Sequence, residues 1–453
     1  GACRGGLATI RVEVEGAEEK LDLSTDYSYT VEVAGSEAKV VAPTIYGAMY
    51  GLETVRQLGS SGVLPHSRIT IKDSPDYAWR GLMLDAGRRF FPVSLVENIL
   101  DTMATVKMNV LHLHASDFCR FSIESKVFPN LTASLTGDYA GHYTQDDIKG
   151  LIAYAKARGI RVVPEFDVPG HSRCWRAVKE AGAQFCTDEE TQNQLYGDPQ
   201  NKTLEVVLAA MDEMASLFED DVFHIGADET AAKGRCSVGS TFALEREILN
   251  HLRGKGKTVE GWEEVLFDAG AATNDTIVNT WSRHLAKDAT ASGRRAVENK
   301  GSSFYFTRPA AAMAEGWKVC WYDLASGVPA EQRNLLLGGE ASMWTDTYLA
   351  ENQCGAYSGA APVGAPLFPP SRDAEFAQSV GGMIWPRGFV AAQAFWHYDS
   401  ARDPTSAEFV AGVSKITDDV IANGGFACPT NCTCDQLTAC GKPYIKAEAS
   451  VLV

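Results

Sequence analysis

Short apolar runs alternate with helical stretches through the middle of this chain, and this alternation constrains its fold more than any other feature. The runs have the length of buried strands, and the stretches between them carry apolar residues at helical spacing. Strands separated by helices indicate a parallel sheet. The expected strands are Gly81–Asp85, Asn109–His114, Ile160–Phe166, Val222–Gly226, Lys257–Trp262, Thr276–Trp281, Ser302–Phe306 and Leu335–Ala341.

This strand–helix repeat matches the size of a (β/α)8 barrel, also called a TIM barrel, which is the expected fold within the α/β class. A doubly wound open sheet is the alternative, but no Gly-rich phosphate loop follows any of the strands. We expect the catalytic barrel to occupy residues 77–425. A small, non-catalytic α/β domain is expected over residues 1–76, and a Cys-rich tail over residues 426–453.

Composition excludes two classes of partner. The chain of 453 residues has a net charge of −17, whereas a nucleic-acid surface needs clustered Lys and Arg. No apolar run approaches the roughly 18 residues of a membrane-spanning helix. We therefore expect neither nucleic-acid binding nor a membrane span.

The cysteines and glycosylation motifs point to the secretory pathway. Four of the eleven cysteines crowd the tail, at Cys428, Cys432, Cys434 and Cys440. A zinc site is the alternative, but paired C-x2-C spacing and a nearby His are missing, so disulfides and an oxidising compartment are favoured. Asn-x-Ser/Thr motifs occur at Asn130, Asn201, Asn274 and Asn431. Without an initiator Met or a signal peptide, the chain reads as a processed protein of the lysosome or the extracellular space.

Two adjacent carboxylates, Asp228 and Glu229, follow the fourth expected strand. Gly226 and Ala227 end that strand with side chains too small to block a ligand. Active sites of parallel α/β proteins are built at the carboxyl ends of strands. A solvated acidic turn is the alternative reading of an isolated Asp-Glu pair.

Other strand ends supply the partners of a sugar site. Aromatic rings cover the C–H faces of a pyranose, while charged groups bind its hydroxyls. Any one of the tryptophans could instead belong to the core, and His112 and His114 could be packed barrel residues or a metal pair lacking an evident third ligand. No G-x-S-x-G motif indicates a serine nucleophile. The candidate residues are Arg80, Asp85, His112, His114, Asp117, Glu165, Asp167, His171, Trp262, Trp281, Tyr305, Trp344 and Asp346.

With these residues assembled, the chain resembles the β-N-acetylhexosaminidases of glycoside hydrolase family 20 over nearly its whole length. The motifs that carry the resemblance are Tyr-Gly-Ala-Met-Tyr-Gly-Leu-Glu-Thr (46–54), Trp-Arg-Gly-Leu-Met-Leu-Asp (79–85), His-Leu-His-Ala-Ser-Asp (112–117), Pro-Glu-Phe-Asp-Val-Pro-Gly-His (164–171), His-Ile-Gly-Ala-Asp-Glu (224–229), Gly-Gly-Glu-Ala-Ser-Met-Trp (338–344) and Trp-Pro-Arg (385–387). The resemblance implies removal of terminal β-linked N-acetylglucosamine or N-acetylgalactosamine from a glycan. It also implies a retaining mechanism in which the substrate's acetamido oxygen is the nucleophile, without a cofactor.

The resemblance also implies the role of each site residue. Glu229 would be the general acid and base, and Asp228 would hold the acetamido N–H and stabilise the oxazolinium-like intermediate. Tyr305 would bind the acetamido oxygen within walls formed by Trp262, Trp281 and Trp344. Arg80 and Asp346 would bind hydroxyls, and Asp117 and His171 would support Glu229 from behind. Cys186 and Cys236 would form a disulfide, and a homodimer is possible because parts of the family dimerise.

Adjacency of the two carboxylates agrees with separate roles. Neighbouring side chains on an extended chain point to opposite sides, so Asp228 and Glu229 can reach different groups of one sugar. Their repulsion favours protonation of one of them, as a general acid requires. Thr307 and Asp346 depart from the family pattern, and Arg308 suggests a preference for anionic sugar substituents. A catalytically silent sugar-binding protein and a metal-dependent hydrolase using His112 and His114 are the alternative functions.

Overall fold

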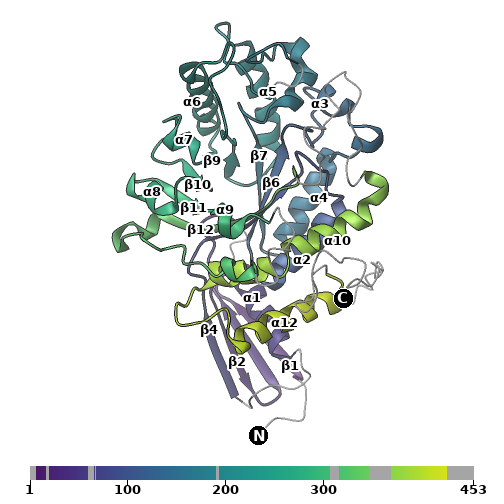
Figure 1. Ribbon diagram of the computed structural model, residues 1–453. Helices are drawn as coiled ribbons and strands as arrows, with labels where there is room; N and C mark the ends of the chain where they lie inside the picture. The colour runs from purple at the N-terminus through teal and green to yellow at the C-terminus, as the bar shows by residue number, and fades with distance from the viewer. Residues whose placement is uncertain are drawn as a thin grey trace.

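The computed structural model describes residues 7–16, 20–59, 66, 68–189, 193–306, 316–346 and 369–425. A small sheet domain lies at one end of the molecule, below a larger body of parallel strands and helices (Figure 1). Thr307, Arg308, Asn431 and the Cys-rich tail lie outside the described residues. Hypotheses about these residues stay predictions.

The small domain is a four-stranded sheet with the order β1-β3-β2-β4 and one covering helix. Apolar residues alternate along β2 and β3, so one face of the sheet buries Val31, Val33 and Val40. Tyr46, Tyr50 and Val55 of the helix α1 belong to the same core. The elements are β1 (Thr9–Val14), β2 (Tyr29–Ala34), β3 (Glu37–Ala42), α1 (Ile45–Gly59) and β4 (Arg68–Asp73).

The larger body is a closed barrel of parallel strands, which confirms the (β/α)8 barrel and excludes the open sheet. Its strands are almost fully buried because the barrel interior is on one side and helices cover the other. The strands are β5 (Trp79–Asp85), β6 (Val110–Ser116), β7 (Arg161–Phe166), β8 (Val222–His224), β9 (Thr258–Trp262), β10 (Ile277–Thr280), β11 (Arg295–Glu298) and β12 (Leu336–Met343).

Helices surround the barrel on its outside, as Figure 1 shows. Leu95, Ile99 and Met103, at helical spacing on α2, illustrate the apolar stripe that faces the strands. The helices are α2 (Val93–Thr105), α3 (Asn130–Ala133), α4 (Gln145–Lys156), α5 (Lys202–Leu217), α6 (Val238–Gly254), α7 (Glu264–Phe267), α8 (Ala286–Ala291), α9 (Gly301–Phe304), α10 (Asp373–Ile384), α11 (Arg387–Trp396) and α12 (Ala407–Ala422).

The seventh strand corrects the sequence prediction. The strand is Arg295–Glu298, whereas most of the expected run, Ser302–Phe306, forms the short helix α9. Three consecutive aromatic residues at 304–306 imitate a short strand, and the true strand is too short, with a charged residue at each end, to show a clear period. Tyr305 still reaches the barrel, because it forms an isolated bridge with Ser342 of β12.

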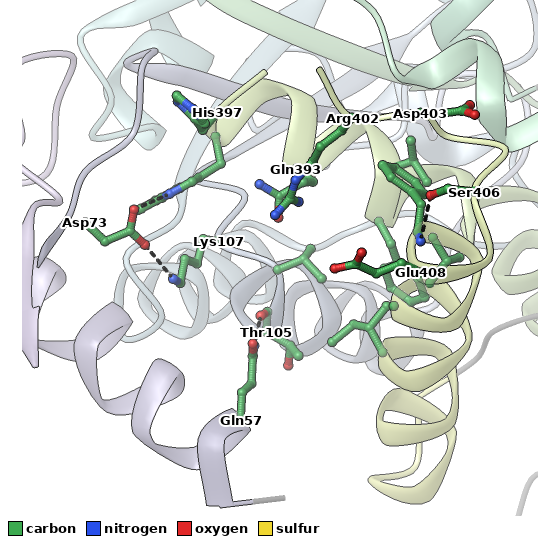
Figure 2. Close-up of a pocket in the computed structure, with 18 of the residues that line it drawn as sticks. Gln57, Asp73, Thr105, Lys107, Gln393, His397, Arg402, Asp403, Ser406 and Glu408 are labelled. Carbon is green, nitrogen blue, oxygen red and sulfur yellow. Dashed lines mark hydrogen bonds and ion pairs between the residues drawn. The ribbon is translucent and has the colours of Figure 1, made fainter. Parts of the chain in front are cut away.

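A cavity of about 890 Å³ lies where the small domain meets α2, α11 and α12 (Figure 2). Asp73 of the small domain contributes to its wall, accepting a hydrogen bond from Trp396 Nε1 at 2.9 Å and pairing with Lys107 at 3.4 Å. Asp73 and Lys107 lie next to the amino-terminal ends of β5 and β6. The cavity is therefore at the opposite end of the barrel from the strand ends that carry Asp228 and Glu229.

The predicted surface and covalent features can be placed in the described residues. A disulfide joins Cys186 and Cys236, whose Cα atoms are 5.0 Å apart. Asn130, Asn201 and Asn274 are exposed, as glycosylation would require. None of the helices in the described ranges is long and apolar enough to span a membrane.

Candidate active site

Asp228 and Glu229 follow β8 in a backbone that turns sharply at the carboxyl end of the barrel. Ala227 and Glu229 have φ values of +72° and +49°, which non-glycine residues rarely adopt. Gly226, also at φ +72°, must be glycine because a Cβ there would lie 1.9 Å from Asp167 Oδ1. The backbone conformation thus sends the two adjacent carboxylates into different surroundings.

Asp228 points inward, with a side chain that is 10% exposed. Burial raises the pKa of Asp228, and the carboxylates of Glu165 and Glu229 add to this effect while His171 opposes it. Burial also raises the pKa of Asp167 well above its usual value, again aided by Asp228. Asp228 Oδ1 has no hydrogen-bond partner among the described residues, so it is available to a ligand.

Glu229 lies above a pair formed by His171 and Asp117. His171 Nε2 lies 3.3 Å from Glu229 Oε2, and its Nδ1 lies 3.5 Å from Asp117 Oδ1. The hydrogen bond from His171 lowers the pKa of Glu229, although partial burial opposes it. In the free protein the surroundings therefore raise the pKa of Asp228 and lower that of Glu229, although a general acid requires a raised pKa. Glu229 remains accessible, with 60% of its side chain exposed.

Arg80 is not part of this site, which corrects the sequence prediction. Its side chain is fully buried and donates hydrogen bonds to the carbonyl oxygens of Lys107 at 2.8 Å and Tyr77 at 2.6 Å. The guanidinium also lies over the rings of Tyr27 and Trp396. Arg80 is at the amino-terminal end of β5, about 16 Å along the strand from Asp85, given a rise of about 3.3 Å per residue.

Arg88, which the sequence analysis missed, supplies a cation at the site. Its guanidinium pairs with Asp85 at 3.0 Å and Asp117 at 3.1 Å, and lies 5.1 Å from the Trp344 ring. Asp346 is exposed at the same rim and interacts electrostatically with Arg88. Arg88 follows β5 by three residues, so its position beyond a strand's carboxyl end was the signal that could have found it.

Four aromatic residues form a box beside Asp228: Trp262, Trp281, Tyr305 and Trp344. The rings of Trp281 and Tyr305 are parallel, with centroids 5.9 Å apart, and Trp344 lies 5.7 Å from Trp262 and 5.9 Å from Tyr305. Burial raises the pKa of Tyr305 well above its usual value, so its hydroxyl group is a hydrogen-bond donor at neutral pH. The box can surround a small apolar group while presenting one polar donor.

Two adjacent glutamates that the sequence analysis did not select hold Trp281 in this box. Glu264 accepts a hydrogen bond from Trp281 Nε1 at 3.1 Å. Glu263 accepts from four successive backbone N–H groups, those of residues 281–284, at 2.8–3.3 Å. Burial, together with Asp228, raises the pKa of Glu264 to about 7.

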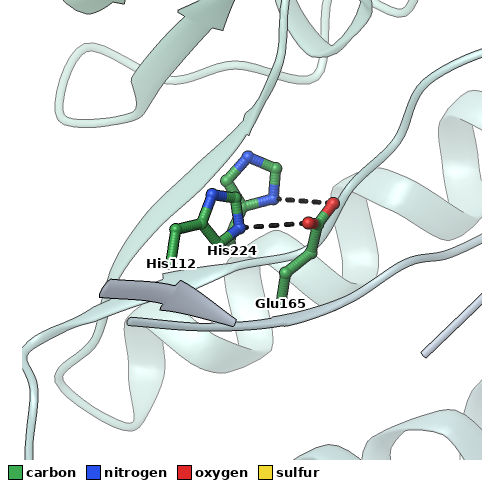
Figure 3. A group of neighbouring side chains, drawn as sticks. All are labelled: His112, Glu165 and His224. Atoms are coloured by element: carbon green, nitrogen blue, oxygen red, sulfur yellow. Dashed lines mark ion pairs between the residues drawn. The ribbon is translucent and has the colours of Figure 1, made fainter. Parts of the chain in front are cut away.

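A buried layer of imidazoles and carboxyl groups lies beneath the box. His112, Glu165 and His224 offer ligand atoms close enough to hold a metal ion, as Figure 3 shows. All three side chains are fully buried, whereas a catalytic metal needs an open coordination position. His112 is also hydrogen-bonded to Glu340 at 3.0 Å, so one of its ring nitrogens is already occupied by a protein partner. This layer fits a hydrogen-bonded network better than a metal centre.

Two carboxylates and an aromatic box at the carboxyl end of a parallel barrel are suited to binding a sugar, and a family comparison places the chain in the glycoside hydrolase class. Residues 77–356 match the model of the glycosyl hydrolase family 20 catalytic domain, and residues 2–58 match a model described as beta-acetyl hexosaminidase like. The chain therefore belongs to glycosyl hydrolase family 20.

Individual relatives agree with the family. The chain is 32% identical over 375 residues to the beta-hexosaminidase subunit beta of Mus musculus, covering 76% of this chain and 69% of that protein. It is 29% identical over 364 residues to the beta-hexosaminidase subunit A1 of Dictyostelium discoideum, covering 74% of this chain and 68% of that protein. The chain thus spans about two thirds of the length of these curated relatives.

Solved structures show the same fold. The chitobiase of Flavobacterium johnsoniae is 27% identical with a TM-score of 0.69, covering 91% of this chain and 61% of that chain. A Streptomyces plicatus beta-hexosaminidase variant, solved with its product GlcNAc, has a TM-score of 0.70 at 21% identity, covering 91% of this chain and 83% of that chain.

Proposed function

We propose that this glycoside hydrolase removes terminal, non-reducing β-linked N-acetylglucosamine or N-acetylgalactosamine by a substrate-assisted retaining mechanism. The observation that carries the proposal is that the two adjacent carboxylates lie in different surroundings. Glu229 is exposed above the Asp117–His171 pair, and Asp228 is buried beside the aromatic box. Two such carboxylates serve different groups of one substrate, as a mechanism without an enzyme nucleophile requires.

Glu229 is suited to proton transfer once the substrate is bound. In the free protein the hydrogen bond from His171 keeps its pKa low. A sugar that covers this exposed side chain would remove water from it and raise its pKa, because burial disfavours a charged carboxylate. His171, whose pKa the neighbouring Asp117 and Asp228 hold well above the usual value despite burial, is a proton donor 3.3 Å away. Glu229 would then protonate the glycosidic oxygen and later accept a proton from water.

Asp228 and the box would hold the acetamido group. The methyl group fits between the aromatic rings, the Tyr305 hydroxyl donates to the acetamido oxygen, and Asp228 accepts its N–H. Attack by that oxygen on the anomeric carbon makes a positively charged ring, which favours the ionised form of Asp228. Arg88 and Asp346 at the rim are placed to bind hydroxyls, in the role that the sequence analysis gave to Arg80 and Asp346.

Turnover of a chromogenic β-N-acetylglucosaminide tests this proposal. We expect the wild type to be active and Glu229→Gln to lose about 10²–10⁴-fold in kcat, the usual contribution of a general acid. A thiazoline mimic of the intermediate should compete tightly with the substrate. A wild type that binds GlcNAc without hydrolysing the glycoside would favour the catalytically silent sugar-binding alternative, and activity that a chelator abolishes would favour the metal-dependent one.

The proposed cellular setting is the secretory pathway, either the lysosome or the extracellular space. The Cys186–Cys236 disulfide supports an oxidising compartment, and three exposed Asn-x-Ser/Thr sites support glycosylation. A mass decrease after enzymatic deglycosylation of the secreted protein would test the second point. A homodimer stays a prediction that light scattering can test.

A further inference from the structure

Glu165 lies at the centre of the buried layer beneath the site. It is on β7 and is fully buried, and four side-chain nitrogen atoms lie close to its two carboxylate oxygens. Oε1 accepts from Trp262 Nε1 at 2.8 Å and lies 3.3 Å from His224 Nδ1. Oε2 lies 2.5 Å from His114 Nδ1 and 3.0 Å from His112 Nε2. Glu165 is thus in direct contact with one wall of the aromatic box.

His114 connects the Glu165 carboxylate to the residues behind Glu229, the proposed general acid. His114 Nε2 is hydrogen-bonded to Asp117 Oδ2 at 2.7 Å, so the ring has a carboxylate at each nitrogen. Only an imidazolium can donate to both. Burial alone would lower the pKa of His114, but Glu165 and Asp117 raise it to about 9. A chain of alternating charge therefore runs from Glu165 through His114, Asp117 and His171 to Glu229.

We propose that Glu165 is a positioning residue of this enzyme, which fixes Trp262 directly and, through His114, fixes Asp117 behind the general acid. This inference rests on the proposed function of Glu229. Glu165 and His114 are fully buried, so neither side chain is accessible to a substrate. Their role is to set the geometry and charge of the groups that touch the substrate, so the box and the acid keep a constant relation to each other.

The charged surroundings of Glu165 determine what its removal would do. His112 and His114 face it from β6 and His224 from β8, and Glu260, Asp167 and Asp228 interact with it electrostatically. Glu340 on β12 lies on the other side of His112, hydrogen-bonded to its Nδ1. Burial would raise the pKa of Glu165, but the histidines hold it well below its usual range, so it is ionised. Loss of this negative charge lowers the pKa of His114 and of Asp228. His114 then loses its proton at a lower pH than in the wild type, and the chain of alternating charges is broken there.

Glu260 offers a matched control in the same layer. It is fully buried like Glu165, but its side chain accepts a hydrogen bond from Asn279 Nδ2 at 3.1 Å and makes no hydrogen bond or ion pair with Trp262 or His114. Burial, with the charge of Glu340, raises the pKa of Glu260 to about 8, so it is already neutral near pH 7. Replacing it with glutamine changes neither size nor charge at that pH.

The experiment compares Glu165→Gln with Glu260→Gln in kcat, KM and the pH profile of kcat/KM. We expect Glu165→Gln to lower kcat at least 30-fold and to move the alkaline limb of the profile at least 0.5 pH units lower. At pH 7, where Glu260 is already neutral, Glu260→Gln should stay within threefold of the wild type in kcat and KM. A folded Glu165→Gln with wild-type kcat and profile would overturn the proposal, and so would equal effects of the two substitutions.

A second pair keeps the proposal testable if Glu165→Gln fails to fold. His114→Gln and His224→Gln each remove one ring from Glu165, but among the two only His114 reaches Asp117. A kcat loss confined to His114→Gln supports the proposal, and equal losses refute it. Wild-type turnover separates this question from the proposed function. If the wild type is inactive, imidazolium signals in ¹⁵N NMR still show whether Glu165→Gln deprotonates His114 at lower pH.

Discussion

Arg80 and Arg88 allow a direct test of which arginine recognises the substrate. The sequence predicted that Arg80 binds the sugar, whereas the structure has Arg88 at the site. Arg80→Met removes a fully buried guanidinium that donates to the carbonyl oxygens of Lys107 and Tyr77. We expect this substitution to destabilise the junction of the two domains while leaving KM unchanged. Arg88→Met should instead lower kcat/KM, because Arg88 lies at the site.

The magnitude for Arg80 follows from its contacts. Two hydrogen bonds from a charged donor contribute about 1.5–3 kcal/mol each, and stacking over aromatic rings adds about 1 kcal/mol. Methionine fills most of the volume and removes the penalty of burying a cation, which offsets part of the loss. A net destabilisation of about 3–4 kcal/mol remains, which corresponds to a fall in Tm of roughly 10 °C.

The assay is scanning fluorimetry at a fixed heating rate, combined with kcat and KM at 20 °C. Arg88→Met leaves Asp85 and Asp117 without their cation beside the substrate, so kcat/KM should fall at least 100-fold. A raised KM and an unchanged Tm for Arg80→Met would refute this reasoning and restore the prediction made from the sequence.

Two further predictions concern the site and its buried layer. Gly226→Ala would place a Cβ against Asp167, which accepts the Ala227 N–H at 3.2 Å, so kcat should fall at least tenfold. The control is Gly270→Ala, which is also at positive φ but has open space around it. This control should lose only about 1 kcal/mol of stability and no activity. His114 has a pKa raised from 6.5 to about 9 by two flanking carboxylates, so its contribution to stability is complete below about pH 6.5 and is lost as pH rises through about 9. Urea midpoints at pH 6, 7.5 and 9 should therefore decline, and an equal decline in His114→Gln would show that this ring is not the cause.

Much of the architecture was readable from local pattern. Apolar runs of strand length separated by amphipathic helices predicted the barrel, because a parallel strand buried on both faces needs both features. Asp228, Glu229 and the tryptophans were found because strand ends converge at one rim in such a fold. The seventh strand was predicted wrongly because Arg295–Glu298 is too short for its hydrophobic period to be recognised.

Electrostatic roles could not be read in this way. Sequence adjacency predicts that Asp228 and Glu229 repel each other, but it does not say which of the two has the raised pKa, because desolvation and the His171 hydrogen bond depend on packing. Arg80 and Arg88 are equally basic in the sequence, and only the direction of β5 places one at the domain junction and the other at the site.

The sequence by itself determined the barrel, the rim on which the chemistry lies, and the residue types that can handle an acetamido sugar. Those properties depend on hydrophobic period and on side-chain chemistry, which are local. Tertiary structure alone decided that Arg88 rather than Arg80 lies at the site, that the pKa of Asp228 is raised while that of Glu229 is lowered, and that Glu165 contacts both Trp262 and His114. These outcomes depend on distances between residues far apart in the chain, and electrostatic interactions change steeply with distance and burial.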